Sequence, residues 1–509
     1  MKLRNIICLS ALASLTLTGC GDDFFDVENA GVASKDEIDE IGNSSPEALV
    51  KVIEPLMLGL NNYTCQYNTQ SSSGTVHNDF GLMSVYHLGD VMNDDLAFEQ
   101  SGSGWFTYDY QLDYWSAQYV RPFFYWNFFY SVIAKANDII AKISTDVTDA
   151  NLKAYRGEAL VYRGFAHAYL AQMYQQTYIG HEDAPGVPIV LTPDEAEEAF
   201  AGRAPLRQVY AQAEKDFKAG MELLTGWKRP NKTMIDEQVA AGLYARMCLV
   251  TNNWDDAITY ARKARTGYSV YTPNELLADN AFNNISAKEW MWGMDITSET
   301  STAFASFFSF MCSYDAGYGG DVGQYRKIDA RLYDSMSASD VRKLLFKHES
   351  TGVEYTAQET KFPEYTNIKF KKVPNWEADY LYMRVSEMIL TEAEALAHKG
   401  DLSGAATVLK ELMAQRDPSW NLSQVSAEDV YQQRRLELWG EGFSLFDHLR
   451  LKKGIDRNYE GSNHLSSARY TIDAGSWYFL YQLPLRELDN SDAISADDQN
   501  PTPTESKFK

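Results

Sequence analysis

The segment from Leu152 to Gln176 constrains the fold most, because it predicts one long helix. One apolar stripe recurs at alternating steps of four and three, the period of a helix face. Its members are Tyr155, Ala159, Tyr162, Ala166, Tyr169 and Met173. A second stripe beside it, of Val161, Phe165 and Ala168, indicates that the helix is covered on more than one side.

Two glycines on one face of this helix predict a close neighbour. Gly157 and Gly164 are seven residues apart. A glycine inside a helix costs about 1 kcal/mol relative to alanine, so two on one face indicate that another helix packs against them. We therefore expect an inner helix in a stack of helix pairs.

The first residues predict a signal peptide that ends in a lipidation site. Lys2 and Arg4 precede an apolar run, Ile6 to Leu17, that is too short to span a bilayer comfortably. The sequence Leu17-Thr18-Gly19-Cys20 is similar to a bacterial lipobox, in which the Cys20 thiol would accept a diacylglycerol. Several acyl chains together anchor a protein firmly. The alternative is an ordinary secretory signal with a chance cysteine.

Charge and cysteine content exclude several classes of protein. The net charge is −24, and loss of Lys2 and Arg4 with the signal leaves −26, so binding to a phosphate backbone is not expected. No later run of eighteen apolar residues predicts a transmembrane helix. Cys65, Cys248 and Cys312 are far apart and odd in number, so we predict buried free thiols and neither a disulfide framework nor a metal site.

Two helix pairs have the spacing of a tetratricopeptide repeat. The first is 235–251 with 254–265, and the second is 381–399 with 402–415. In each, two alanines lie twelve residues apart where the paired helices would touch. These are Ala245 and Ala257 in the first pair, and Ala393 and Ala405 in the second.

Other segments complete the expected fold. Further helices are predicted over 45–60, 122–143, 206–224 and 427–451, and short strands over 289–295, 361–373 and 477–481. Residues 61–120 lack a clean period. The fold class is mostly α, with tetratricopeptide-like helical pairs and a loop-rich, partly β insertion.

The predicted domain organisation has three parts. Residues 1–19 are the signal peptide and 20–44 a lipidated N-terminus and tether. Residues 45–509 form one domain, with helical repeats over 45–280 and 380–490 and a variable insertion over 281–379.

Several segments together resemble the SusD/RagB family of outer-membrane nutrient-binding lipoproteins. They follow the family's order over nearly the whole chain. The matching segments are 17–20, 156–159 with 163–166, 290–295, 384–388 with 392–395, 434–438 with 441–443 and 446–450, 483–488 and 499–501. The two tryptophans of the first strand, Trp290 and Trp292, depart from the usual aliphatic pattern.

The resemblance implies a non-catalytic protein that needs no cofactor. Family members form a lid on a TonB-dependent, SusC-like outer-membrane transporter and capture glycans, or in some cases peptides, for import. It also implies a lipid anchor at Cys20 in the outer membrane of a Gram-negative bacterium, and Asp22-Asp23 resembles an acidic signal for the outer face. No nucleic acid is expected as a partner.

Family sugar sites are arcs of surface aromatic residues with polar neighbours, so we predict the ligand site from the two irregular regions. Exposed aromatics in loops usually serve binding. The candidates are Trp105, Tyr108, Tyr314, Tyr318, Tyr325 and Trp376, with Asn93, Asp94, Asp321 and Arg326 as polar partners. Tyr110, Tyr114 and Trp115 are expected to pack into the next helix.

No catalytic motif is present, and other functions stay open. The chain has no His-Glu-x-x-His, no phosphate loop and no Gly-x-Ser-x-Gly. Asp94, Asp95 and Glu99 could serve a surface glycosidase, but a solvated loop or a calcium-type cluster explains them more simply. His448 and the charged set around Arg434 and Glu437 are expected to pack in the core or form ion pairs. A peptide-binding lid and a structural helical-repeat scaffold are the remaining alternatives.

Overall fold

The computed structural model describes residues 40, 45–67, 76–102, 104–194, 202–314, 317–371 and 373–508. The predicted signal peptide and the tether with Cys20 lie outside these residues, apart from Glu40. By its contacts the chain divides into two units, Met1–Val52 and Ile53–Lys509. Helix α3 spans Pro46–Tyr63, and its first residues belong to the first unit. All the helices and strands described below belong to the second unit.

The fold class is confirmed as mostly α. The longer helices are α6 Val120–Lys142, α7 Ala150–Tyr174, α8 Leu206–Leu224, α9 Glu237–Val250, α10 Trp254–Arg265, α15 Val385–His398, α16 Leu402–Met413 and α17 Ala427–Glu437. The shorter ones are α4 Leu82–Val91, α5 Thr107–Tyr110, α11 Pro273–Leu276, α12 Phe307–Met311, α13 Gly317–Gly320, α14 Ala330–Asp334, α18 Ser444–Arg450 and α19 Leu485–Asn490.

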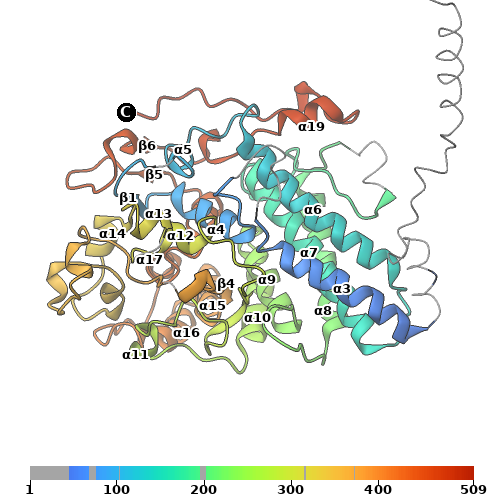
Figure 1. Cartoon of the computed structure of the whole chain (residues 1–509), viewed down its shortest axis with the longest axis horizontal. Coiled ribbons are helices and arrows are strands. Elements are labelled where there is room, and N and C mark those ends of the chain that lie inside the picture. The colour runs from blue at the N-terminus through green and yellow to red at the C-terminus, as the bar shows by residue number, and fades with distance from the viewer. Residues whose placement is uncertain are drawn as a thin grey trace, which may run out of the picture. The chain divides into compact units, whose positions relative to one another are not determined.

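The helices pack as a continuous series of pairs. Contacts run from α6 to α7, α8, α9 and α10, and then to α15, which also contacts α16 and α17; Figure 1 shows α6, α7 and α8 side by side. The predicted glycine contact is present, because a Cβ on Gly157 would lie 2.9 Å from the Gly220 carbonyl of α8. Ala245, Ala257, Ala393 and Ala405 are all fully buried, as the repeat spacing predicts.

Three two-stranded antiparallel sheets accompany the helices. β1 Leu96–Phe98 pairs with β3 Arg326–Ile328, β2 Trp290–Met294 with β4 Tyr380–Arg384, and β5 Ile455–Asp456 with β6 Thr471–Ile472. Leu96 faces Ile328 in the first pair and Trp290 faces Arg384 in the second, where the register is irregular around Trp292. Trp290 and Trp292 are both buried.

Several predicted elements differ from the structure. Residues 381–384 belong to β4 and not to the following helix. The helix predicted over 427–451 is two helices, because Gly440 and Gly442 between them adopt positive φ angles of 76° and 90°. A Cβ on Gly442 would lie 2.4 Å from the Cβ of Tyr86, so this turn packs directly on α4.

Two predicted strands are wrong. Residues 477–479 form one 3-10 turn, whose Ser476 hydroxyl accepts from the Tyr478 N–H. In the segment 361–373, the residues that the structure describes contribute only isolated bridges at Thr366 and Asn367. Helix α4 was missed because all ten of its residues are buried, which removes the amphipathic period.

Buried ion pairs join the second sheet to α17. Arg384 at the end of β4 bonds to Glu289, Glu437 and Glu441. Arg434 pairs with Asp447 at 3.0 Å, and the buried His448 lies beside them. The predicted ion pairs of this segment are therefore confirmed, and its charges are structural.

Candidate functional site

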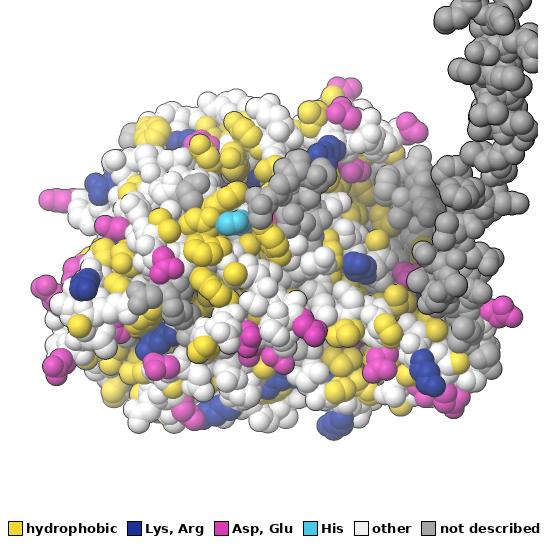
Figure 2. Space-filling model, viewed as in Figure 1, with side chains coloured by type: hydrophobic (Ala, Val, Ile, Leu, Met, Phe, Trp, Pro, Cys, Tyr) yellow, Lys and Arg dark blue, Asp and Glu magenta, His cyan; other side chains and the backbone are white. Residues whose placement is uncertain are grey.

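Five rings from separate segments meet at the surface and form what we call the aromatic platform. They are His77, Trp105, Phe304, Tyr318 and Trp376. Phe304 is 42% exposed, and the other four are partly exposed. Figure 2 shows hydrophobic side chains gathered around a histidine on the face that carries α4, α12 and α13.

Ring contacts link the platform from end to end. Phe304 lies between Trp376 and Tyr318, with centroid distances of 5.6 and 5.8 Å. His77 stacks on Trp105 at 5.2 Å and lies 5.9 Å from Tyr318. The result is a row of apolar ring surfaces at the protein surface.

Hydrogen bonds fix the rings relative to one another. The Tyr318 hydroxyl accepts from Trp105 Nε1 at 2.7 Å and lies 2.7 Å from His77 Nδ1. Since the hydroxyl accepts from Trp105, it can donate its own hydrogen to His77. Trp105 Nε1, the Tyr318 hydroxyl and His77 Nδ1 are thus satisfied by each other, which leaves the outer ring faces of the platform for contact with a ligand.

An apolar layer supports the platform from below. Phe310 stacks under Tyr318 at 4.9 Å, and Phe106 meets Phe310 edge to face at 4.9 Å. His87 lies in this layer and is fully buried, and among the described residues neither of its nitrogens has a hydrogen-bond partner. Burial, with Arg326 and Arg121 nearby, holds the pKa of His87 well below its usual value, so it stays neutral.

Buried polar groups position the Trp105 loop. The Arg121 guanidinium, 1% exposed, donates to the Trp105 carbonyl at 2.7 Å and to Asp109 Oδ1 at 2.7 Å. Burial raises the pKa of Asp109, and Arg121 opposes that shift. A charge-assisted pair of this kind fixes a loop more firmly than a neutral hydrogen bond.

Unusual backbone geometry places the other two segments. Asn375 and Trp376 both have φ angles of 63°, which is uncommon for residues other than glycine. The Ser301 hydroxyl donates to the Trp376 carbonyl at 3.0 Å and ties this turn to the segment of Phe304. Gly317 also has a positive φ, 55°, and a Cβ there would clash with Ser309 of α12.

The other predicted aromatic residues form two further groups. Tyr108 is 45% exposed, and its ring approaches Tyr114 at 4.7 Å. Tyr314 and Tyr325 both contact Phe362, at 5.5 and 5.3 Å. The structure therefore brings Trp105, Tyr318 and Trp376 together and places Tyr314 and Tyr325 in a separate cluster.

Three of the predicted polar partners lie in the interior. Asn93 is fully buried and lies 2.7 Å from His448 Nδ1. Asp94 is 6% exposed and lies 3.4 Å from His448 Nε2, and Arg326 is 2% exposed with its guanidinium 3.6 Å above the Phe98 ring. Asp321 alone is exposed, in the turn after Tyr318.

Two of the three acidic residues considered for catalysis are internal. Asp94 and Asp95 are buried, so the predicted solvated loop is wrong for them, and Arg435 Nε donates to Asp95 Oδ1 at 2.9 Å. Glu99 pairs with Lys327 at 2.6 Å. Within the described residues, no group of three or more His, Cys, Asp or Glu is placed to hold a metal ion.

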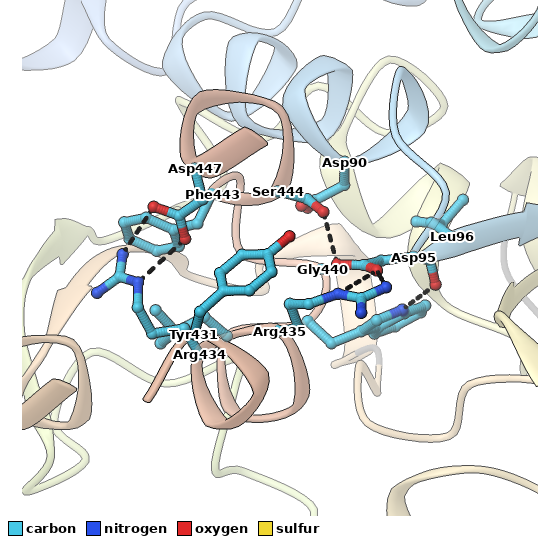
Figure 3. Close-up of a pocket in the computed structure, with 12 residues that line it drawn as sticks. Asp90, Asp95, Leu96, Tyr431, Arg434, Arg435, Gly440, Phe443, Ser444 and Asp447 are labelled. Atoms are coloured by element: carbon cyan, nitrogen blue, oxygen red, sulfur yellow. Dashed lines mark hydrogen bonds and ion pairs between the residues drawn. The ribbon is translucent and has the colours of Figure 1, made fainter. Parts of the chain in front are cut away.

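A small pocket near this group is structural. Figure 3 shows its charged lining: Arg434 forms an ion pair with Asp447, and the Asp95 carboxylate accepts hydrogen bonds from Arg435 and Ser444. The cavity measures about 10 Å³, close to the minimum for one water molecule. We assign no ligand to it.

Sequence reasoning missed His77 and Phe304. Both lie in the two irregular regions, where the aromatic residues chosen as candidates were all tyrosines and tryptophans. A single histidine or phenylalanine in a loop carries no signal of its own. Their roles follow from contacts with Trp105 and Trp376, which are distant in sequence.

The sequence matches two family models. Residues 68–249 match a model described as "Starch-binding associating with outer membrane", and residues 347–502 match the SusD family model. No curated relative matches the chain. None of the described helices is both long and apolar enough to cross a membrane.

Solved structures share the fold. A SusD-like carbohydrate binding protein from Bacteroides vulgatus is 23% identical with a TM-score of 0.74, covering 89% of this chain and 98% of that one. The surface glycan-binding protein A from Bacteroides uniformis is 19% identical, with a TM-score of 0.65 and coverage of 88% and 99%. A laminarin binding SusD-like protein is 17% identical, with a TM-score of 0.65 and coverage of 89% and 99%.

The two matched regions include most of the helical stack and the segment that ends near the C-terminus. The chain belongs to the SusD/RagB family.

Proposed function

We propose that the aromatic platform binds a carbohydrate chain, without catalysis, at the cell surface. The observation that carries this proposal is the row of exposed and partly exposed rings, in which the Tyr318 hydroxyl bonds to both Trp105 Nε1 and His77 Nδ1. Pyranose rings present apolar C–H faces that stack on such rings. Two structural relatives, a surface glycan-binding protein and a laminarin binding protein, support the same ligand class.

Polar groups beside the platform would supply orientation. Sugar hydroxyls need fixed partners, and Asp321, exposed in the turn after Tyr318, is the predicted candidate. The buried Asn93, Asp94 and Arg326 are left out of the proposed site. The net charge of −24 favours a neutral glycan over a strongly anionic one.

The cellular role follows from the family and the N-terminal sequence. We infer that Cys20 carries the lipid anchor and that the protein delivers its glycan to a TonB-dependent, SusC-like transporter in the outer membrane. The Leu17–Cys20 sequence and the description "associating with outer membrane" support this role.

A binding screen tests the proposal. The protein beginning after Cys20 is applied to an array of neutral and anionic polysaccharides and of peptides. The best glycan is then titrated against Trp105→Ala and Trp376→Ala, each expected to weaken binding about tenfold because stacking area is lost. Trp420→Ala, at a partly exposed tryptophan after α16, is the control.

Two results would contradict the proposal. One is glycan binding that is equally strong in all three variants, which would place the site elsewhere. The other is a peptide hit with no glycan hit, which would favour the peptide-binding lid. Thermal melting of each variant separates lost binding from lost folding.

A further inference from the structure

A second cavity lies apart from the aromatic platform and shares no residue with it. It measures about 170 Å³ and lies between α6, the loop before α8 and α19. Phe123, Trp126 and Tyr130 of α6 line one side, Pro188 and Val190 another, and Glu487 of α19 completes the wall. The cavity has room for a single ring-sized ligand.

The aromatic wall is built from one face of α6. Positions 123, 126 and 130 follow the spacing that places side chains together on a helix. The rings of Trp126 and Tyr130 are 4.9 Å apart, and Trp126 is only 4% exposed. The Tyr130 hydroxyl donates to the Pro188 carbonyl at 2.8 Å, which anchors the ring across the cavity.

Glu487 brings an uncompensated carboxylate to this apolar space. Its Oε2 accepts from Trp126 Nε1 at 3.2 Å. Among the described residues Glu487 forms no ion pair, and the neighbouring Arg486 guanidinium lies 4.6 Å from the centroid of the Phe123 ring. Burial raises the pKa of Glu487, which is the expected result of a carboxylate without a counter-ion.

We propose that this cavity binds a small organic cation, a protonated amine carried on a compact apolar body. The ammonium would donate to Glu487 in a charge-assisted hydrogen bond, and the body would lie against Trp126 and Tyr130. An amino sugar and an alkyl amine such as a lysine side chain share this chemistry. The proposal does not depend on glycan binding at the aromatic platform.

Four small ligands distinguish the possibilities. Glucosamine, N-acetylglucosamine, glucose and n-butylamine are titrated calorimetrically into the protein that begins after Cys20. Glucosamine or butylamine is expected to bind about tenfold tighter than either neutral sugar, because only the amines carry a charge. The tighter of the two amines identifies the source as a sugar or an alkyl chain.

A matched pair of variants assigns the effect to the carboxylate. Glu487→Gln keeps the size of the side chain and an acceptor for Trp126, and should weaken amine binding about tenfold. Asp489→Asn makes the same kind of change at an exposed position of α19 and should leave binding unchanged. Trp105→Ala should also leave it unchanged.

Three outcomes would overturn the proposal. In the first, glucosamine and N-acetylglucosamine bind with equal affinity. In the second, Glu487→Gln binds the amines as tightly as the parent protein does. In the third, neither amine binds at a ligand concentration of about 10 mM. A melting curve for Glu487→Gln that matches the parent protein shows that a loss of binding is not a loss of folding.

Discussion

Replacing Glu437 by Gln should destabilise the protein by about 3–5 kcal/mol, because it removes the shared anion of a buried network. Glu437 is 3% exposed, and its carboxylate lies 2.8 Å from Arg384 Nη1 and 2.9 Å from Arg416 Nε. Arg342 Nη1 lies 3.5 Å away. Of the described carboxylates, Arg416 would keep Glu289 alone as a counter-ion, at 3.7 Å.

The loss should depend on pH. Burial alone would raise the pKa of Glu437, but Arg416 and Arg384 outweigh burial and hold it well below the ordinary value of 4.5. A carboxyl with a lowered pKa stabilises the fold above its unfolded pKa, and this contribution is lost as the pH falls through the folded pKa. The difference between parent and variant should therefore be full at neutral pH and shrink below about pH 4.5.

The assay is urea unfolding followed by tryptophan fluorescence and circular dichroism. Glu428→Gln is the matched control, since Glu428 lies on the same helix with a side chain that is 56% exposed. It should change stability by less than about 0.5 kcal/mol. A Glu437→Gln variant that is no less stable than Glu428→Gln would refute the described network.

Three other predictions follow from particular contacts. Burial raises the pKa of Glu158 to about 8, so its stabilising contribution is full below pH 4.5 and is lost as the pH rises toward 8. Between these values the free energy of unfolding should fall by about 1.4 kcal/mol per pH unit. Glu158→Gln should remove this pH dependence, which urea unfolding between pH 5 and 7.5 measures. Gly220→Ala places a Cβ 2.6 Å from Val161 Cγ2 and should lower the free energy of unfolding by about 1–3 kcal/mol. Gly59→Ala meets no atom within 4 Å and should raise the free energy of unfolding by about 1 kcal/mol. Equal effects of the two variants in thermal melts would contradict the described packing of α7 on α8. Tyr318→Phe keeps the stacked ring but loses the hydroxyl that accepts from Trp105. Glycan affinity should therefore fall about fivefold with little change in melting temperature. An unchanged affinity would show that this hydrogen bond does not organise the platform.

The sequence was most informative where helices are amphipathic or follow a repeat. The predicted bounds 206–224 and 254–265 agree with α8 and α10, and the glycines of α7 correctly indicated a close neighbour. Prediction failed where tertiary contacts decide the local structure. The segment 381–384 pairs with β2 as a strand, and the turn at Gly440 and Gly442 divides a helix that the pattern alone would continue.

The candidate site was only partly accessible to sequence reasoning. Three of the chosen rings, Trp105, Tyr318 and Trp376, lie in the two irregular regions and belong to one surface, although the first of these regions also contains helix α4. Which polar residues face solvent was not predictable, because Asn93 and Arg326 follow the same loop pattern as Asp321 and yet are buried. Burial there depends on pairing of β1 with β3, which are more than two hundred residues apart.

The central claim is that a carbohydrate stacks on the aromatic platform, and a crystal structure with the glycan identified by the screen tests it most directly. We expect pyranose rings on Trp105 and Trp376, with hydroxyl contacts on the side of Asp321. Binding of the glycan at another surface, with the platform rings unoccupied, would contradict the proposed function.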